Sequence, residues 1–118
     1  MLEKFTVLTS ERLERSVKRA MQLKPKVRIV SVDERRYLVK LANQPGKIYL
    51  VEFENVHTNG AWERRGCCRE AEYVGGELVT NGYCKGFGVA GHCYHLASAA
   101  AVNYGIQKMR RDLERKAA

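Results

Sequence analysis

Several features that would fix a function class are missing from this sequence. No apolar run approaches the roughly 20 residues that a membrane-spanning helix needs. Residues 1–6 contain no apolar h-region, which argues against a secretory signal and predicts an intracellular, cytoplasmic protein with reduced thiols. There is no H-E-x-x-H motif, no P-loop, and no glutamate beside a candidate metal ligand as in deaminases. We therefore expect a protein that is neither secreted nor an enzyme.

Acidic residues are scarce relative to basic ones. The 118-residue chain has 21 Lys and Arg against 13 Asp and Glu, which gives a net charge of +8. Residues 1–36 contain ten basic and five acidic residues, residues 37–82 five and six, and residues 83–118 six and two. The basic excess lies in the two end segments, which is typical of a protein that binds a polyanion. A surface that is merely well solvated is the alternative.

The most informative pattern is a run of potential metal ligands in residues 84–95, C-K-G-F-G-V-A-G-H-C-Y-H. Thiolate and imidazole are the preferred protein ligands of zinc. Cys93 and His95 are spaced to converge on one ion where a chain enters a helix, and Cys84 reaches the ion from the far end of the loop. A structural zinc ion takes four ligands. The candidates for the fourth ligand are Cys67, Cys68 and His92. The main alternative to a metal site is a set of disulfide bonds.

Cys67 is the fourth ligand that strand geometry favours. Residues 70–82 predict a β-hairpin in which Gly75-Gly76 is a two-residue turn. If residue 74 pairs with residue 77, the same register places Cys67 opposite Cys84, and directly opposed side chains lie about 4.5–5.5 Å apart at Cβ. Cys68 then points to the other face, unless a bulge shifts the register by one residue and exchanges the two cysteines.

This cysteine-rich region resembles the SWIM zinc-finger family. The family pattern is C-x-C, a variable loop, and then C-x-H at the start of a helix, all after a small β-sheet. Cys84, Cys93 and His95 match its second half, and the resemblance covers roughly residues 37–104. The family's first cysteine would fall at Gly82, so Cys67 or Cys68 would have to replace it across the hairpin. The resemblance implies zinc-dependent binding of DNA or of another protein.

Helices are expected at both ends of the chain. Thr9 and Ser10 are suitable N-cap residues, and Lys24-Pro25 ends the first helix because the residue before proline avoids the α region. The last helix is expected over about residues 93–116. Its predicted buried stripe has helical spacing and consists of Ala99, Val102, Ile106, Met109 and Leu113.

Between the helices the sequence predicts an antiparallel meander of strands at residues 27–32, 36–41 and 47–53. Its aromatic residues are expected to pack in the core: Tyr37, Tyr49 and Phe53. Residues 55–66 are polar and are expected to be irregular, with Trp62 covering the edge of the sheet. The whole chain, 1–118, is interpreted as one α+β domain: an N-terminal helical segment (1–25), a β-sheet region (26–82), and the zinc loop with the C-terminal helix (83–118).

These features together predict a small zinc-binding domain that binds nucleic acid, with DNA favoured over RNA. The predicted metal ligands are Cys67, Cys84, Cys93 and His95. Basic residues of both end segments are expected to contact phosphates: Arg12, Arg15, Arg19, Lys85, Lys108, Arg111 and Arg115. The alternative is a zinc-stabilised adaptor whose basic surface docks an acidic protein partner.

Overall fold

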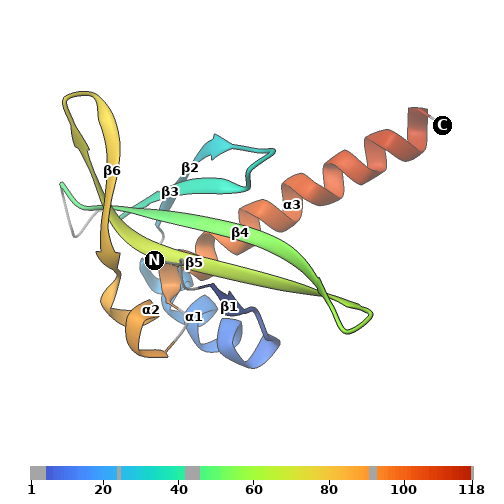
Figure 1. Cartoon of the computed structure of the whole chain (residues 1–118), viewed down its shortest axis with the longest axis horizontal. Coiled ribbons are helices and arrows are strands. Elements are labelled where there is room, and N and C mark those ends of the chain that lie inside the picture. Colours follow the sequence, from blue (N-terminus) through green and yellow to red (C-terminus); the bar gives the residue numbers. More distant parts are fainter. Residues whose placement is uncertain (1–4, 24, 42–45, 91–92, 118) are drawn as a thin grey trace.

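The computed structural model describes residues 5–23, 25–41, 46–90 and 93–117, and it has the expected α+β fold. An antiparallel sheet lies beside a short and two longer helices (Figure 1). The elements in chain order are β1 (Thr6–Val7), α1 (Ser10–Leu23), β2 (Lys26–Ser31), β3 (Arg36–Lys40), β4 (Ile48–Thr58), β5 (Ala61–Val74), β6 (Glu77–Tyr83), α2 (Lys85–Ala90) and α3 (Tyr94–Ala117).

The sheet is built around the long β4–β5 hairpin. The strand order is β1-β5-β4-β3-β2, and β6 pairs with the same edge of β5 as β1 does, further along the strand. The expectation that residues 55–66 are irregular is wrong, because β4 and β5 continue pairing out to Thr58 and Ala61. Asn59 and Gly60 form the turn with φ of 51° and 79°. Asn-Gly is a strong hairpin signal because both residues tolerate positive φ.

One face of the sheet forms the main core. Side chains alternate along a strand, so Tyr37, Val51 and Cys68, which lie opposite one another on β3, β4 and β5, share this face. α3 contacts four strands and α1. Leu96, near the start of α3, is fully buried. The expected core aromatic residues are confirmed as buried: Tyr37, Tyr49 and Phe53.

α3 is longer than the surface that it covers. Ala99 is buried and Val102 and Ile106 pack against the core, as the predicted stripe requires. Met109 and Leu113 are 65% and 64% exposed, so the expectation that they are buried is wrong. Figure 1 shows the reason, since the C-terminal part of α3 runs past β2 and β3 and diverges from the β4–β5 hairpin. Among the described helices, none combines the length and the hydropathy that crossing a membrane requires.

Candidate metal centre

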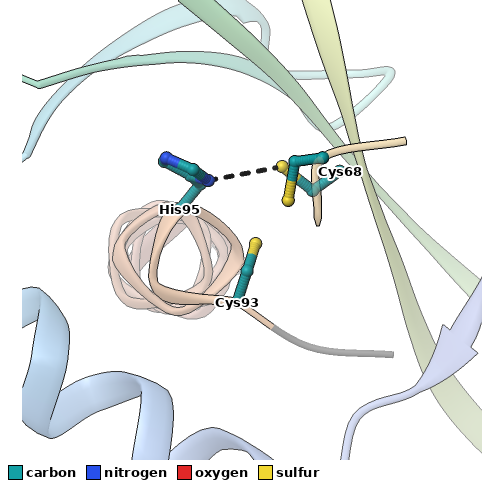
Figure 2. A group of neighbouring side chains, drawn as sticks. Cys68, Cys93 and His95 are labelled. Atoms are coloured by element: carbon teal, nitrogen blue, oxygen red, sulfur yellow. Dashed lines mark hydrogen bonds between the residues drawn. The ribbon is translucent and has the colours of Figure 1, made fainter. Parts of the chain in front are cut away.

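Four buried side chains with metal-binding groups come together where the sheet meets the start of α3. They are Cys68, Cys84, Cys93 and His95, and their potential ligand atoms all lie within 4.8 Å of one another. Figure 2 shows His95, on the first turn of α3, and Cys93, directly before that helix, pointing toward Cys68 on β5. The cluster therefore connects β5, the junction of β6 with α2, and α3.

The fourth member of this cluster is Cys68, so the prediction that Cys67 faces Cys84 is wrong. The hairpin begins in the expected register, with Val74 opposite Glu77, but the register shifts between Ala71 and Arg69. Beyond the shift the Cys84 amide donates to the Cys68 carbonyl at 3.3 Å. A β-bulge is a one-residue insertion in the ladder, and it exchanges the two neighbouring cysteines.

Cys67 occupies the other side of β5. It lies opposite Glu52 on β4, and Glu52 accepts a hydrogen bond from Arg69, which is two residues from Cys67 and shares its face. Cys67 is only 1% exposed, and Cys68 is fully buried. The two cysteines therefore differ in the face that they occupy, not in their degree of burial.

Backbone amides support two of the sulfurs. Cys84 and Cys93 directly precede α2 and α3, the position of an N-cap residue. The amide of Phe87 donates to Cys84 Sγ at 3.4 Å, and the amide of Leu96 donates to Cys93 Sγ at the same distance. Each sulfur therefore takes the place of the usual capping oxygen. N–H donors and a helix N-terminus both favour a thiolate over a thiol.

The sulfurs interact strongly with one another. Hydrogen bonds from the Cys68 and Cys93 thiols lower the pKa of Cys84 well below its ordinary value. Burial, followed by the bond to Cys84, raises the pKa of Cys68. At Cys93 the bond with Cys68 lowers the pKa, but the bond with Cys84 and burial outweigh it and raise the pKa to about 12. These interactions therefore favour ionisation of Cys84 over ionisation of Cys68 and Cys93.

His95 is held by ring stacking and by a hydrogen bond with Cys68 (Figure 2). Its ring stacks on Tyr49 with centroids 3.7 Å apart, and its Nδ1 lies 3.8 Å from Cys68 Sγ. Its Nε2 is buried and has no hydrogen-bond partner among the described residues. Burial of the Tyr49 hydroxyl raises its pKa to about 12, so this ring stays neutral at physiological pH. Tyr49 was predicted only as a core residue, and its contact with His95 has no signature in the sequence.

The cluster fits a metal ion. In a tetrahedral zinc site with bonds of about 2.0–2.3 Å, the ligand atoms are separated by roughly 3.5–3.8 Å. The potential ligand atoms lie within 4.8 Å of one another, so the most distant pair would have to move about 1 Å closer to bind one ion. Cys68 Sγ and His95 Nδ1, at 3.8 Å, would hardly have to move. Three cysteines and one histidine are a common ligand set of structural zinc sites. The described residues thus form a possible metal-binding site.

The predicted phosphate-binding residues are not gathered in one place. Arg19 is on α1, Lys85 begins α2, and Lys108, Arg111 and Arg115 are on the C-terminal part of α3, which runs past β2 and β3. All five of these side chains are exposed. The side chains of Arg12 and Arg15 lie outside the described structure, as does the whole of His92, the third candidate for the fourth ligand.

Trp62 does not cover the edge of the sheet, and that expectation is wrong. It lies beside the β4–β5 turn with 72% of its surface exposed, in edge contact with His57 at 5.1 Å between ring centroids. The extension of the hairpin beyond β3 carries Trp62 away from the core.

Comparisons with known proteins give this chain no relatives. No protein-family model, no curated protein and no solved structure matches it.

Proposed function

We propose that this chain is a small zinc-binding domain that binds nucleic acid, with DNA as the favoured partner. The observation that supports the metal is the buried cluster of three cysteines and one histidine. The SWIM resemblance favours zinc, because Cys84, Cys93 and His95 match the family pattern. Cys68 takes the role of the cysteine that would stand at Gly82, since it lies directly across the hairpin from Cys84.

The metal would have a structural role. Four protein ligands complete a tetrahedral shell, whereas catalytic zinc keeps one position open for water or substrate. The ion would join β5, the end of β6 and the start of α3, three segments that are distant in the sequence. We therefore propose that the ion fixes α3 on the sheet and that the domain is not an enzyme.

Charge supports nucleic acid as the partner. The net charge is +8, and the last 36 residues contain six basic and two acidic residues. Five of these basic side chains are exposed on α3: Lys108, Arg110, Arg111, Arg115 and Lys116. A protein that places such side chains on phosphates releases counterions, so its affinity falls steeply with salt.

Gel shifts of the zinc-loaded protein on a DNA duplex at several salt concentrations test this proposal. The slope of log K against log salt should be negative, with about 0.9 for each phosphate contact. Replacing Lys108 and Arg115 together with glutamine should reduce that slope by up to about 1.8. Salt-insensitive binding, or no binding to any nucleic acid, would refute the proposal.

The exposed indole of Trp62 favours a second candidate, the adaptor that docks an acidic protein partner. Exposed tryptophans are common anchors of protein interfaces. A pull-down that recovers one partner in stoichiometric amount, unchanged by nuclease and weakened by Trp62→Ala, would support this function over nucleic-acid binding.

A further inference from the structure

A groove lined by arginines lies between α3 and the β4–β5 hairpin, which diverge from each other in Figure 1. Its volume is about 360 Å³, within the range of small-ligand sites. Five arginines from three parts of the chain line it, against two glutamates, Glu54 and Glu114. The arginines are Arg35, Arg64, Arg65, Arg110 and Arg111. Of these five, only Arg111 is among the residues predicted to contact phosphates, because only the fold brings the others to it.

Only two of the five arginines are paired with an acidic residue among the residues that the structure describes. Arg65 pairs with Glu63 at 3.0 Å, and Arg110 pairs at 3.4 Å with Asp33, whose side chain is 88% exposed. The other three arginines form no ion pair with any residue that the structure describes. Because guanidinium groups bind phosphate in a bidentate manner, the groove is suited to a ligand with more than one phosphate.

A second hollow of about 390 Å³ adjoins the groove and is apolar in character. The two hollows share several lining residues, among them Arg64 and Tyr104. The remaining wall of the second hollow is made of Val17 on α1 and of Ala97, Ala100 and Ala101 on α3. Tyr104 is 53% exposed at the boundary, so an aromatic ring stands where the charged and the apolar hollows meet.

The junction of the two hollows is held firmly. Asn103, which lines both, accepts a hydrogen bond of 2.7 Å from the hydroxyl of Tyr37. Tyr37 is fully buried in the sheet. This bond holds α3 against β3 at one point, beside Tyr104.

We propose that these adjoining hollows bind single-stranded nucleic acid, an inference that rests on the proposed function and specifies its ligand. Phosphates lie against Arg64 and Arg111 in the groove, and a base stacks on Tyr104 and enters the apolar hollow. Arginines that follow the backbone beside an aromatic ring on which a base stacks are typical of single-strand binding. In a duplex the bases are paired and stacked, so none is free to enter the apolar hollow. The protein should therefore prefer a single strand.

Fluorescence anisotropy with a labelled 12-nucleotide oligothymidylate, and with a duplex of the same length, tests the inference. Wild-type protein should bind the single strand more tightly. Tyr104→Ala should weaken single-strand binding at least about fivefold through loss of stacking. Tyr73→Ala is the matched control, since Tyr73 is 55% exposed but lies outside both hollows, and its affinity should match the wild type. Thermal unfolding of each variant checks that the fold is retained.

Salt dependence tests the arginines separately. Arg64→Gln and Arg111→Gln should each lower the slope of log K against log salt by about 0.7, the single-strand value for one phosphate. Arg28→Gln removes an exposed charge on β2, outside the groove, and should leave the slope nearly unchanged.

Each outcome of these titrations decides between the inference and the proposed function. If the wild type prefers duplex and Tyr104→Ala binds like the wild type, the groove inference is wrong and nucleic-acid binding still stands. If the wild type binds neither probe at low salt, nucleic-acid binding fails and this inference fails with it.

Discussion

Cys67 and Cys68 provide a direct test of the metal centre, because the two neighbours are equally buried and face opposite sides of β5. Cys68→Ser removes one of four ligands, whereas Cys67→Ser removes none. Structural zinc in finger peptides contributes an apparent 10–16 kcal/mol, so an equal share for one ligand is about 2.5–4 kcal/mol. We expect Cys68→Ser to weaken zinc binding by roughly two to three orders of magnitude.

The assay is a competition titration of zinc against a chromophoric chelator, together with elemental analysis of the purified proteins. Wild type and Cys67→Ser should hold one zinc ion per chain with similar affinity. Cys67→Ser should still lower the free energy of unfolding by about 1–3 kcal/mol, because it buries a hydroxyl in place of a thiol. Cys67→Ser should therefore change the free energy of unfolding but not the zinc affinity, whereas Cys68→Ser should weaken zinc binding.

The reverse result would refute the reasoning. If Cys67→Ser lost the zinc and Cys68→Ser kept it, the hairpin would have to continue without the bulge. If the wild type purified without chelator held no zinc, the four side chains would be a packed core cluster and the zinc proposal would fall.

Two further substitutions test how the start of α3 is positioned. Gly66→Ala should lower the free energy of unfolding by about 1–3 kcal/mol, because an added Cβ would lie 2.7 Å from Leu96 Cδ1. Gly82→Ala is its control in chemical denaturation, since no atom lies within 4 Å of an added Cβ there, and equal losses in both variants would contradict the packing. Tyr49→Ala should weaken zinc binding about tenfold by releasing the His95 ring. Tyr49→Phe keeps the stack and should bind zinc like the wild type, and a similar loss in both variants would show that the hydroxyl, not the stack, matters.

The sequence could predict those parts of the centre that depend on local spacing. Cys84, Cys93 and His95 lie within twelve consecutive residues, and two of them sit at or beside a helix start, so their convergence follows from short-range geometry.

The choice between Cys67 and Cys68 depends on a bulge on β6, where the stretch from Thr80 to Tyr83 is one residue longer than the stretch from Ala71 to Arg69 that it faces on β5. Gly82 lies in this stretch, and a glycine inside a strand often marks a bulge, but the predicted hairpin continued the register of its turn straight through it. Side chains along a strand alternate between the two faces of the sheet, so one inserted residue changes which cysteine faces Cys84. The prediction of Cys67 as the fourth ligand failed for this reason.

The predictions that were wrong outside the metal centre failed for a different reason. Asn59-Gly60 is a hairpin turn sequence, but the residues on both sides of it are polar, so the sequence did not indicate strands there. The outer half of the β4–β5 pair extends beyond β3. Met109 and Leu113 follow a regular helical spacing, yet spacing predicts only which face is apolar and cannot say whether a neighbour covers it. The arginine groove likewise has no local signature, since its residues come from β4, β5, α3 and the turn before β3.

The geometry of α3 links the proposed metal to the proposed nucleic-acid binding. Cys93 lies ten residues before Asn103 and eighteen before Arg111, which correspond to about 15 and 27 Å along a helix. With Asn103 held by Tyr37, Arg111 lies eight residues or about 12 Å further along the helix, so a tilt of about 10° would move it by roughly 2 Å, enough to lengthen a hydrogen bond to a phosphate beyond its normal range. The bond from Tyr37 to Asn103 fixes one point of the helix, and one point alone does not fix a direction. A metal ion bound by the cluster would supply a second point, so an ion that touches no nucleic acid would still influence where the α3 arginines lie relative to Arg64.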